Sequence, residues 1–333
     1  MSPDKQNMRQ VILELPYQFT QGHERASGEG KKYAHKKFEN IVIAGMGGSA
    51  LSGEILQMLR EELGLKVPVF INKDYNLPLE ANKKSLIIIS SYSGNTEETL
   101  SAYKEARKNK FHTAVITTGG KLRRAALKDK TPLVEIPAGV QPRLALGYQF
   151  GAILALCADA KLIRSQKKHL EYLTEYMEKN MKETEKKGRK LAEQVGTHVP
   201  VIYSTNKYRQ IAYILKIQIN ENAKRHAFYN YFPELNHNEM VGYEKTKTKS
   251  FDIIMLKAKN DAKENVKRME LTKKLIKDRG YKVHDIDIKE KKMYDITFYT
   301  ILLGLWFSYY LAIEGGVDPT PVNIVEEFKK ELK

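Results

Sequence analysis

Three hydroxyl side chains stand close together in one short segment, in an order that suits phosphate binding. Ser91, Ser93 and Thr96 belong to the run Ser-Tyr-Ser-Gly-Asn-Thr-Glu-Glu-Thr at residues 91–99, called here the hydroxyl segment. The apolar, mostly β-branched residues 86–89 before it predict a buried parallel strand, and helical spacing follows it. Where a strand leads into a helix, the N–H groups of the first helical turn and the positive end of the helix dipole face a bound anion. The hydroxyl segment therefore predicts a site for a phosphorylated small molecule.

A glycine turn, Gly45-Met46-Gly47-Gly48-Ser49, follows a strand expected at residues 41–44. Glycine lets the backbone approach a ligand closely, and Ser49 can cap the next helix or contact an anion. The run fits a loose form of the dinucleotide fingerprint, but the second strand ends at Asn72 instead of the acid that would hold a ribose. A tight structural turn is the alternative. Taken with the hydroxyl segment, the glycine turn favours one joint ligand site where the strand order reverses.

Acid and base groups are concentrated in the second half of the chain. Glu221 lies between two asparagines at the end of a helix expected at residues 211–222, and His237 lies in the run Asn-His-Asn-Glu at residues 236–239. Such groups are costly to bury unless they are hydrogen-bonded into a site. Glu221 is a candidate general base, and His237 is a candidate proton shuttle because imidazole exchanges protons near neutral pH. Taken singly, each has an ordinary alternative, a helix-end carboxylate or a loop histidine.

Arg143 follows a loop that contains proline and glycine and precedes a helix expected at residues 144–162. A cation there would stabilise negative charge that develops on a substrate, although an ordinary surface arginine is the alternative. Metal binding is disfavoured because His226, His237 and Glu239 do not have a metal-ligand spacing. A serine nucleophile is disfavoured because the chain has no G-x-S-x-G elbow.

The composition indicates a globular protein of two ordinary domains, because 333 residues with 42% hydrophobic and 29% charged content can bury two cores. The single cysteine, Cys157, excludes an intramolecular disulfide framework and is expected to be a buried, inert thiol. With no basic and apolar leader, we expect a cytoplasmic protein. The net charge of +16 is spread over the expected helix faces, which favours a solvated surface over a nucleic-acid site. The apolar run 296–313 predicts a helix buried against a sheet or in a dimer contact, because it is short and polar for a membrane span.

Strand and helix patterns alternate twice along the chain. Residues 1–160 predict a first domain with strands near 41–44, 67–71, 86–90, 114–117 and 133–136. After a charged helix at 165–195, residues 161–333 predict a second domain with strands at 199–203, 251–256 and 282–286, and a last long helix at 292–314. This rhythm predicts an α/β fold of two doubly wound parallel sheets flanked by helices. The motifs differ between the halves, so we expect the second half not to hold a second phosphate.

Five segments in this order resemble the bifunctional phosphoglucose/phosphomannose isomerases, which are built from two sugar isomerase (SIS) domains. The resemblance covers residues 41–329 and rests on residues 45–49, 91–99, 142–143, 220–224 and 233–239. It implies sugar-phosphate contacts from Gly47, Ser49, Ser91, Ser93 and Thr96. It also implies that Arg143 lies near the enediolate intermediate, that Glu221 moves the proton between C1 and C2, and that a neighbouring subunit donates His237 for ring opening. In the C-terminal part it implies a ring-opening lysine at Lys329, with Lys330 as the alternative, and a hydroxyl at Thr320 linked to accepting both C2 epimers.

The activity implied by the resemblance is the interconversion of glucose 6-phosphate, and mannose 6-phosphate, with fructose 6-phosphate in a homodimer. This acid–base chemistry requires neither a metal nor an organic cofactor. One alternative is another SIS-fold isomerase, although those are usually single-domain chains. The other is a non-catalytic sugar-phosphate sensor, but only about 40 residues precede the first strand, too few for a helix-turn-helix module and linker. We expect neither nucleic acid nor membrane as a partner.

Overall fold

The computed structural model describes residues 2–245 and 250–332 of the chain. These residues form two compact units, Leu13–Glu178 and the combination of Met1–Ile12 with Lys179–Lys333. Both boundaries fall inside helices, α1 (Met8–Ala26) and α6 (Lys167–Val195), whereas the sequence pattern predicts one boundary at residue 160. The two halves of α6 pack in different units: Thr174 donates a hydrogen bond to the carbonyl of Pro16, and Gly188 packs on Trp306.

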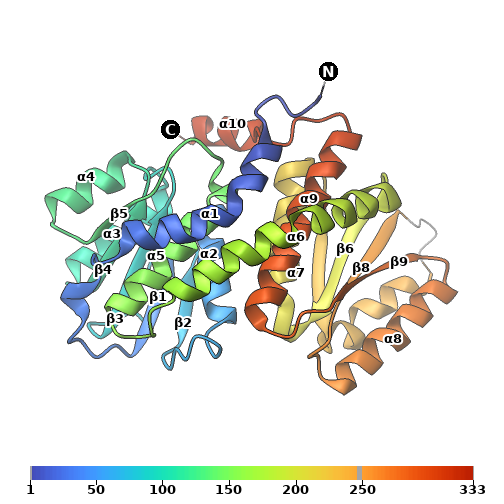
Figure 1. Ribbon diagram of the computed structural model, residues 1–333, viewed down its shortest axis with the longest axis horizontal. Coiled ribbons are helices and arrows are strands. Elements are labelled where there is room, and N and C mark those ends of the chain that lie inside the picture. The colour runs from blue at the N-terminus through green and yellow to red at the C-terminus, as the bar shows by residue number, and fades with distance from the viewer. Residues whose placement is uncertain (1, 246–249, 333) are drawn as a thin grey trace. The chain divides into compact units, whose positions relative to one another are not determined.

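Five parallel strands form the sheet of the first unit, in the order β2-β1-β3-β4-β5 (Figure 1). The bounds are β1 (Asn40–Ala44), β2 (Val69–Asn72), β3 (Ser85–Ser91), β4 (His112–Thr117) and β5 (Leu133–Glu135). Each strand overlaps a run that the sequence predicts. Every residue of β1 and β3 is buried, as expected for strands that helices cover on both faces.

Helices cover both faces of this first sheet. The helices α3 (Glu97–Lys108) and α4 (Gly120–Lys128) pack on the face that carries Ile87 and Ile89. On the opposite face lies α2 (Gly48–Met58), where Gly53 sits directly against Ile43. The helix α5 (Leu146–Asp159) contains Cys157, which is fully buried, and burial raises the pKa of its thiol to about 12. The doubly wound arrangement and the buried cysteine are confirmed.

The sheet of the second unit has four parallel strands in the order β7-β6-β8-β9. The bounds are β6 (Val199–Thr205), β7 (Phe228–Phe232), β8 (Phe251–Ala258) and β9 (Lys282–Ile288). The sequence predicts β6, β8 and β9 but not β7. This edge strand, Phe-Tyr-Asn-Tyr-Phe, has no β-branched residue, and Phe228 and Tyr229 remain exposed, so it lacks the pattern of a buried strand.

The helices of the second unit also lie on two faces of their sheet. On one face, α7 (Arg209–Ala223) packs against α9 (Met293–Glu314), with Gly304 of α9 directly against Leu215. On the other face lie α8 (Lys263–Asp278) and the short 3-10 helices η4 (Glu234–His237) and η5 (Glu239–Tyr243). The C-terminal helix is α10 (Asn323–Glu331). By length and composition α9 could cross a membrane, but 89% of its most apolar stretch is buried inside the protein, which confirms the predicted core helix.

Candidate active site

The order of strands in the first sheet brings the glycine turn and the hydroxyl segment to one place. The chain leaves β1 toward β2 on one side and later returns to β3 on the other, so the strand order reverses between β1 and β3. These two strands are paired in register, with Ala44 opposite Ile89, and the glycine turn and the hydroxyl segment follow their carboxyl ends. Ligands of open α/β sheets bind at such a point. The backbone N–H of Tyr92 donates to Ser49 Oγ at 3.0 Å, so the two segments are in direct contact.

The hydroxyl of Ser49 is oriented by two donors. Its oxygen accepts hydrogen bonds from the backbone N–H of Tyr92 and, at 3.2 Å, from the side-chain amide of Gln149. A serine hydroxyl has two lone pairs and one hydrogen, so both lone pairs are occupied and the hydrogen is left for an acceptor. Ser49 is buried in the first turn of α2. Its hydroxyl lies at the amino end of that helix, where an anion would find the helix dipole and free N–H groups.

The hydroxyl segment presents further donors at the start of α3. Ser91 Oγ donates to Thr96 Oγ1 at 3.2 Å and accepts the backbone N–H of Gly94 at 3.2 Å. Because Thr96 accepts this bond, its own hydroxyl hydrogen is left for another acceptor. Thr96 is the N-cap of α3, whose first N–H groups have no partner within the helix, and Ser93 is exposed. Hydroxyl and backbone donors of this kind are the donor set that a phosphate group needs.

Tyr92 holds the hydroxyl segment in place through hydrogen bonds to three other parts of the first unit. Its N–H is bound to Ser49, and its carbonyl accepts from Thr118 Oγ1 at 2.7 Å. Its phenol oxygen accepts the backbone N–H of Val140 at 3.1 Å, and burial raises the pKa of this phenol. Tyr92 belongs to the hydroxyl segment, but the sequence alone predicts no role for it. A large aromatic residue within a run of small polar ones is the signal that could have found it.

Arg143 lies beside the glycine turn through its backbone. It belongs to η2 (Pro142–Leu144), and a Cβ atom added to Gly48 would lie 2.4 Å from the Arg143 nitrogen. Only glycine at position 48 leaves room for this contact. Arg143 is 4% exposed, so it is a buried arginine and not the surface arginine of the alternative. Gly47, the N-cap of α2, has φ +50°, a backbone conformation that glycine adopts without strain.

In the second unit, Lys224 joins the end of α7 to the segment that carries Thr320. Lys224 has the left-handed conformation that ends the helix, and its Nζ donates to the carbonyls of Glu221 at 2.6 Å and Pro319 at 2.9 Å. Asn222 donates to Ser308 of α9 at 2.9 Å, which fixes the same helix end. Glu221 and the buried Thr320 are thus held at one end of this unit. Because Lys224 and Pro319 are 95 residues apart, no local pattern predicts this link.

His237 and Glu221 lie on opposite faces of the second sheet. Side chains alternate along a strand, so Tyr229 and Tyr231 face one way while Asn230, and Tyr203 beside it in β6, face the other. The helix α7 contacts the first pair, with Tyr213 packed on Tyr229 at 5.4 Å and the Arg209 guanidinium over Tyr231 at 5.9 Å. Glu239 in η5, two residues after His237, binds Tyr203 and Asn230 from the second side.

The structure does not bring the remaining predicted residues to Glu221. His237 is exposed at the end of η4. Lys329 is exposed on α10 and forms an ion pair with Glu326 of the same helix at 2.7 Å, and none of the described α10 residues is buried. In the part of the chain that the structure describes, no three His, Cys, Asp or Glu side chains gather as metal ligands.

Comparison with known proteins settles the family. Residues 184–332 match the bacterial phospho-glucose isomerase C-terminal SIS domain, and residues 33–141 match the SIS domain. A bifunctional phosphoglucose/phosphomannose isomerase of Caldicellulosiruptor bescii is 38% identical over 98% of this chain and 98% of its own. The chain belongs to the bifunctional phosphoglucose/phosphomannose isomerase family. The protein of the same name from Aquifex aeolicus is 34% identical over 89% of this chain and 91% of its own.

Membership of this isomerase family confirms the resemblance, the isomerase class and the presence of SIS domains. A putative phosphosugar isomerase of Clostridium difficile has a similar structure, with a TM-score of 0.74 and 15% identity over all of this chain and 98% of its own. At that identity the similarity concerns the fold, and it confirms the predicted α/β architecture.

At the carboxyl edge of the second sheet, this chain has a carboxylate in place of a hydroxyl segment. Asp261 follows β8 and accepts hydrogen bonds from Thr205 Oγ1 at 2.5 Å and the Ala258 N–H at 3.0 Å. Burial raises the pKa of this carboxyl. A carboxylate repels an anion, so this edge lacks the donor set of the first sheet, and the absence of a second phosphate site stays a prediction.

Proposed function

We propose that this chain interconverts glucose 6-phosphate and mannose 6-phosphate with fructose 6-phosphate, the substrates that the names of its relatives indicate. The observation that carries the proposal is the contact between the glycine turn and the hydroxyl segment in a member of this family. Ser49, Ser91, Ser93 and Thr96, with the first turns of α2 and α3, supply donors without bringing cationic side chains. We assign them, with Gly47, to the phosphate end of the sugar.

The proposed reaction moves one proton between neighbouring carbons. After ring opening, Glu221 takes the C2 proton of the aldose and the C1 carbonyl oxygen becomes the oxyanion of a cis-enediolate. The O2 hydroxyl proton then passes to O1, and Glu221 returns its proton to C1 as O2 becomes the ketone oxygen. No net oxidation or reduction occurs. Arg143 is assigned to the negative charge of the enediolate, because a buried guanidinium stabilises charge that develops close to it. Thr320 is held at the same end of its unit as Glu221, and we assign it to a contact with the substrate near C2.

Ring opening requires a second acid–base group, and we assign it to His237 with Lys329. Within one chain the second sheet lies between Glu221 and the segment that carries His237. His237 is nevertheless exposed, as a residue that serves a neighbouring molecule must be. We therefore propose a homodimer in which the partner subunit's His237 completes the site. Lys330 is the alternative ring-opening lysine, and single substitutions of Lys329 and of Lys330 distinguish the two.

A coupled assay tests the function. Fructose 6-phosphate formed from glucose 6-phosphate, and separately from mannose 6-phosphate, is measured without added metal and with chelator. Turnover of at least the glucose substrate is expected, and turnover of neither would overturn the proposal. We place the enzyme in the cytoplasm and expect no nucleic acid or membrane partner. A DNA gel shift that depends on fructose 6-phosphate would favour the sensor alternative.

A further inference from the structure

We propose that Glu239 is a positioning residue that fixes the imidazole of His237 for ring opening. The proposal rests on the proposed function, since it assigns a role within that reaction. Glu239 belongs to the run at residues 236–239, and no step of the reaction above uses it. It lies two residues after His237 in the segment formed by η4 and η5, residues 234–243, called here the His237 segment.

Both carboxylate oxygens of Glu239 are bound by the sheet beneath. Oε1 accepts the phenol hydrogen of Tyr203 in β6, and Oε2 accepts the side-chain amide of Asn230 in β7. Tyr203 has one hydroxyl hydrogen, so the 2.5 Å contact between the Tyr203 and Tyr243 oxygens must use the hydrogen of Tyr243. The result is a relay of donors from Tyr243 through Tyr203 to Glu239. The Glu239 carboxylate thereby ties the His237 segment to β6 and β7. Tyr243, which belongs to the same segment, joins this network through Tyr203.

These phenols keep their hydrogens throughout the working range of such an enzyme. Burial raises the pKa of Tyr243 to about 12. Burial, followed by the neighbouring Tyr243 and Glu239, also raises the pKa of Tyr203. Both groups therefore remain neutral donors at neutral and mildly alkaline pH, and the anchor at Glu239 persists with them.

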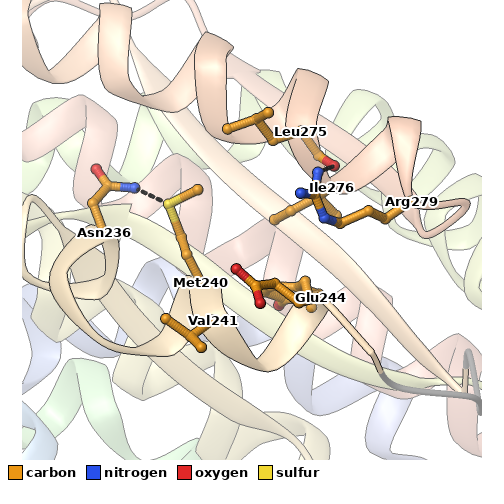
Figure 2. Close-up of a pocket in the computed structure, with 8 residues that line it drawn as sticks. Asn236, Met240, Val241, Glu244, Leu275, Ile276 and Arg279 are labelled. Atoms are coloured by element: carbon orange, nitrogen blue, oxygen red, sulfur yellow. Dashed lines mark hydrogen bonds between the residues drawn. The ribbon is translucent and has the colours of Figure 1, made fainter.

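The other side of the His237 segment contacts α8 through both polar and apolar groups. There Asn236 donates to Thr272 Oγ1 of α8 at 2.8 Å and to the sulfur of Met240 at 2.8 Å. Figure 2 shows Asn236 directed at Met240. Both residues line a pocket of about 220 Å³, together with Leu275 and Ile276 of α8. Leu235 of the segment is fully buried in one core cluster with Met269 and Ile276 of α8, and the polar anchors act beside this apolar contact. His237 lies between the anchor at Asn236 and the anchor at Glu239.

Substitution of Glu239 tests the role through both kinetics and the state of His237. Glu239→Ala should lower kcat for glucose 6-phosphate on the order of 10- to 100-fold with little change in KM, the scale expected when a catalytic group is displaced by about 1 Å. Glu239→Gln should lose less, because its amide oxygen still accepts from Tyr203 while its NH2 group faces the NH2 of Asn230. Tyr203→Phe removes one anchor without changing charge and should cause a smaller loss of the same kind.

Two comparisons separate positioning from general damage. Glu234→Gln changes an exposed carboxylate of the same segment, whose contact is to Asn238, and should leave kcat within about 2-fold. If Glu239 acts through His237, adding Glu239→Ala to His237→Ala should cause no further loss of kcat. An additional loss of about 10-fold in the double variant would show a role that does not pass through His237 and would overturn the proposal.

A measurement without substrate keeps this test distinct from that of the function. The imidazole NMR signals of His237, assigned by comparison with His237→Ala, should shift and broaden in Glu239→Ala but not in Glu234→Gln. Unchanged His237 signals would overturn the positioning role even in a fully active enzyme. An inactive wild type with shifted His237 signals would overturn only the proposed function.

Discussion

Glu221 and His237 are separated by the second sheet of their own chain, with Glu221 on the α7 face and His237 in the segment on the α8 face. A proton-transfer base and a ring-opening acid must both reach a sugar of six carbons. Two groups with a layer of strands between them do not meet on one such molecule. We therefore propose that a working site combines Glu221 of one subunit with the partner subunit's His237.

Subunit complementation should follow from this separation. Glu221→Gln and His237→Ala are each expected to be nearly inactive alone. In a mixed dimer, the chain with the Glu221→Gln substitution keeps its histidine and the other chain keeps its glutamate, so one of the two sites is intact. Random pairing makes half of the dimers mixed, and co-expression should restore about a quarter of wild-type activity.

The control for complementation is a pair of chains that carry the same substitution. Two copies of Glu221→Gln with different purification tags cannot form an intact site and should stay inactive. Mixed dimers isolated through both tags should have about half of the wild-type specific activity, because one of two sites works. Inactivity of purified mixed dimers would show that each chain uses its own histidine.

Glu221→Gln alone should separate catalysis from binding. Removing a general base lowers turnover by roughly 10²- to 10⁴-fold, while the donors around Ser49 and Ser91 are unaffected. We expect isomerisation and the exchange of the C2 proton with deuterated water to fall together. Calorimetry with fructose 6-phosphate should give a Kd within about 3-fold of the wild-type value. Proton exchange that persists at the wild-type rate would remove Glu221 from the role of base.

Ser49→Ala and Ser93→Ala should differ in their effect on stability. Ser49 Oγ is the acceptor for two buried donors, the Tyr92 N–H and the Gln149 amide, and a buried donor without an acceptor costs about 1–3 kcal/mol. Ser93 is exposed and accepts only the N–H of Asn95, at 3.3 Å. Both variants should raise KM for the sugar phosphate, but urea unfolding should show a loss of stability only for Ser49→Ala. Equal stability of the two variants would contradict the role of Ser49 Oγ as the acceptor for these two buried donors.

The sequence predicts the parts of this protein that depend on local pattern. Runs such as residues 86–89 predict buried strands because parallel strands covered on both faces are continuously apolar. The glycine turn and the hydroxyl segment could likewise be predicted from the sequence, because an anion site at a helix start needs small residues and hydroxyls in a fixed order. The edge strand β7 was not predicted, since exposed aromatic residues on an outer strand give no buried pattern.

Links between distant residues were not predictable in the same way. The bond from Lys224 to Pro319 spans 95 residues, and the bond from Gln149 to Ser49 spans 100. No spacing in the chain signals either pair, because both follow from how helices pack after the sheets have formed. The helix α1 was also missed. It buries Met8, Ile12, Leu15 and Phe19 along one stripe but contains Pro16, which ordinarily ends a helix.

Gly48→Ala should damage catalysis more than a comparable substitution in the same helix. The new Cβ would lie 2.4 Å from the Arg143 nitrogen and 2.6 Å from its Cα, and backbone atoms cannot move aside as side-chain ends do. The Arg143 backbone must therefore shift by about 1 Å, which costs on the order of 10²-fold in rate when the residue acts on the substrate. Gly53→Ala, further along α2, would instead meet side-chain atoms, Ile71 Cδ1 at 2.9 Å and Ile43 Cγ2 at 3.0 Å. It should lower the thermal midpoint but leave kcat/KM within about 3-fold. A Gly48→Ala enzyme with wild-type kcat/KM would separate Arg143 from the reaction, because its displacement would then have no catalytic consequence.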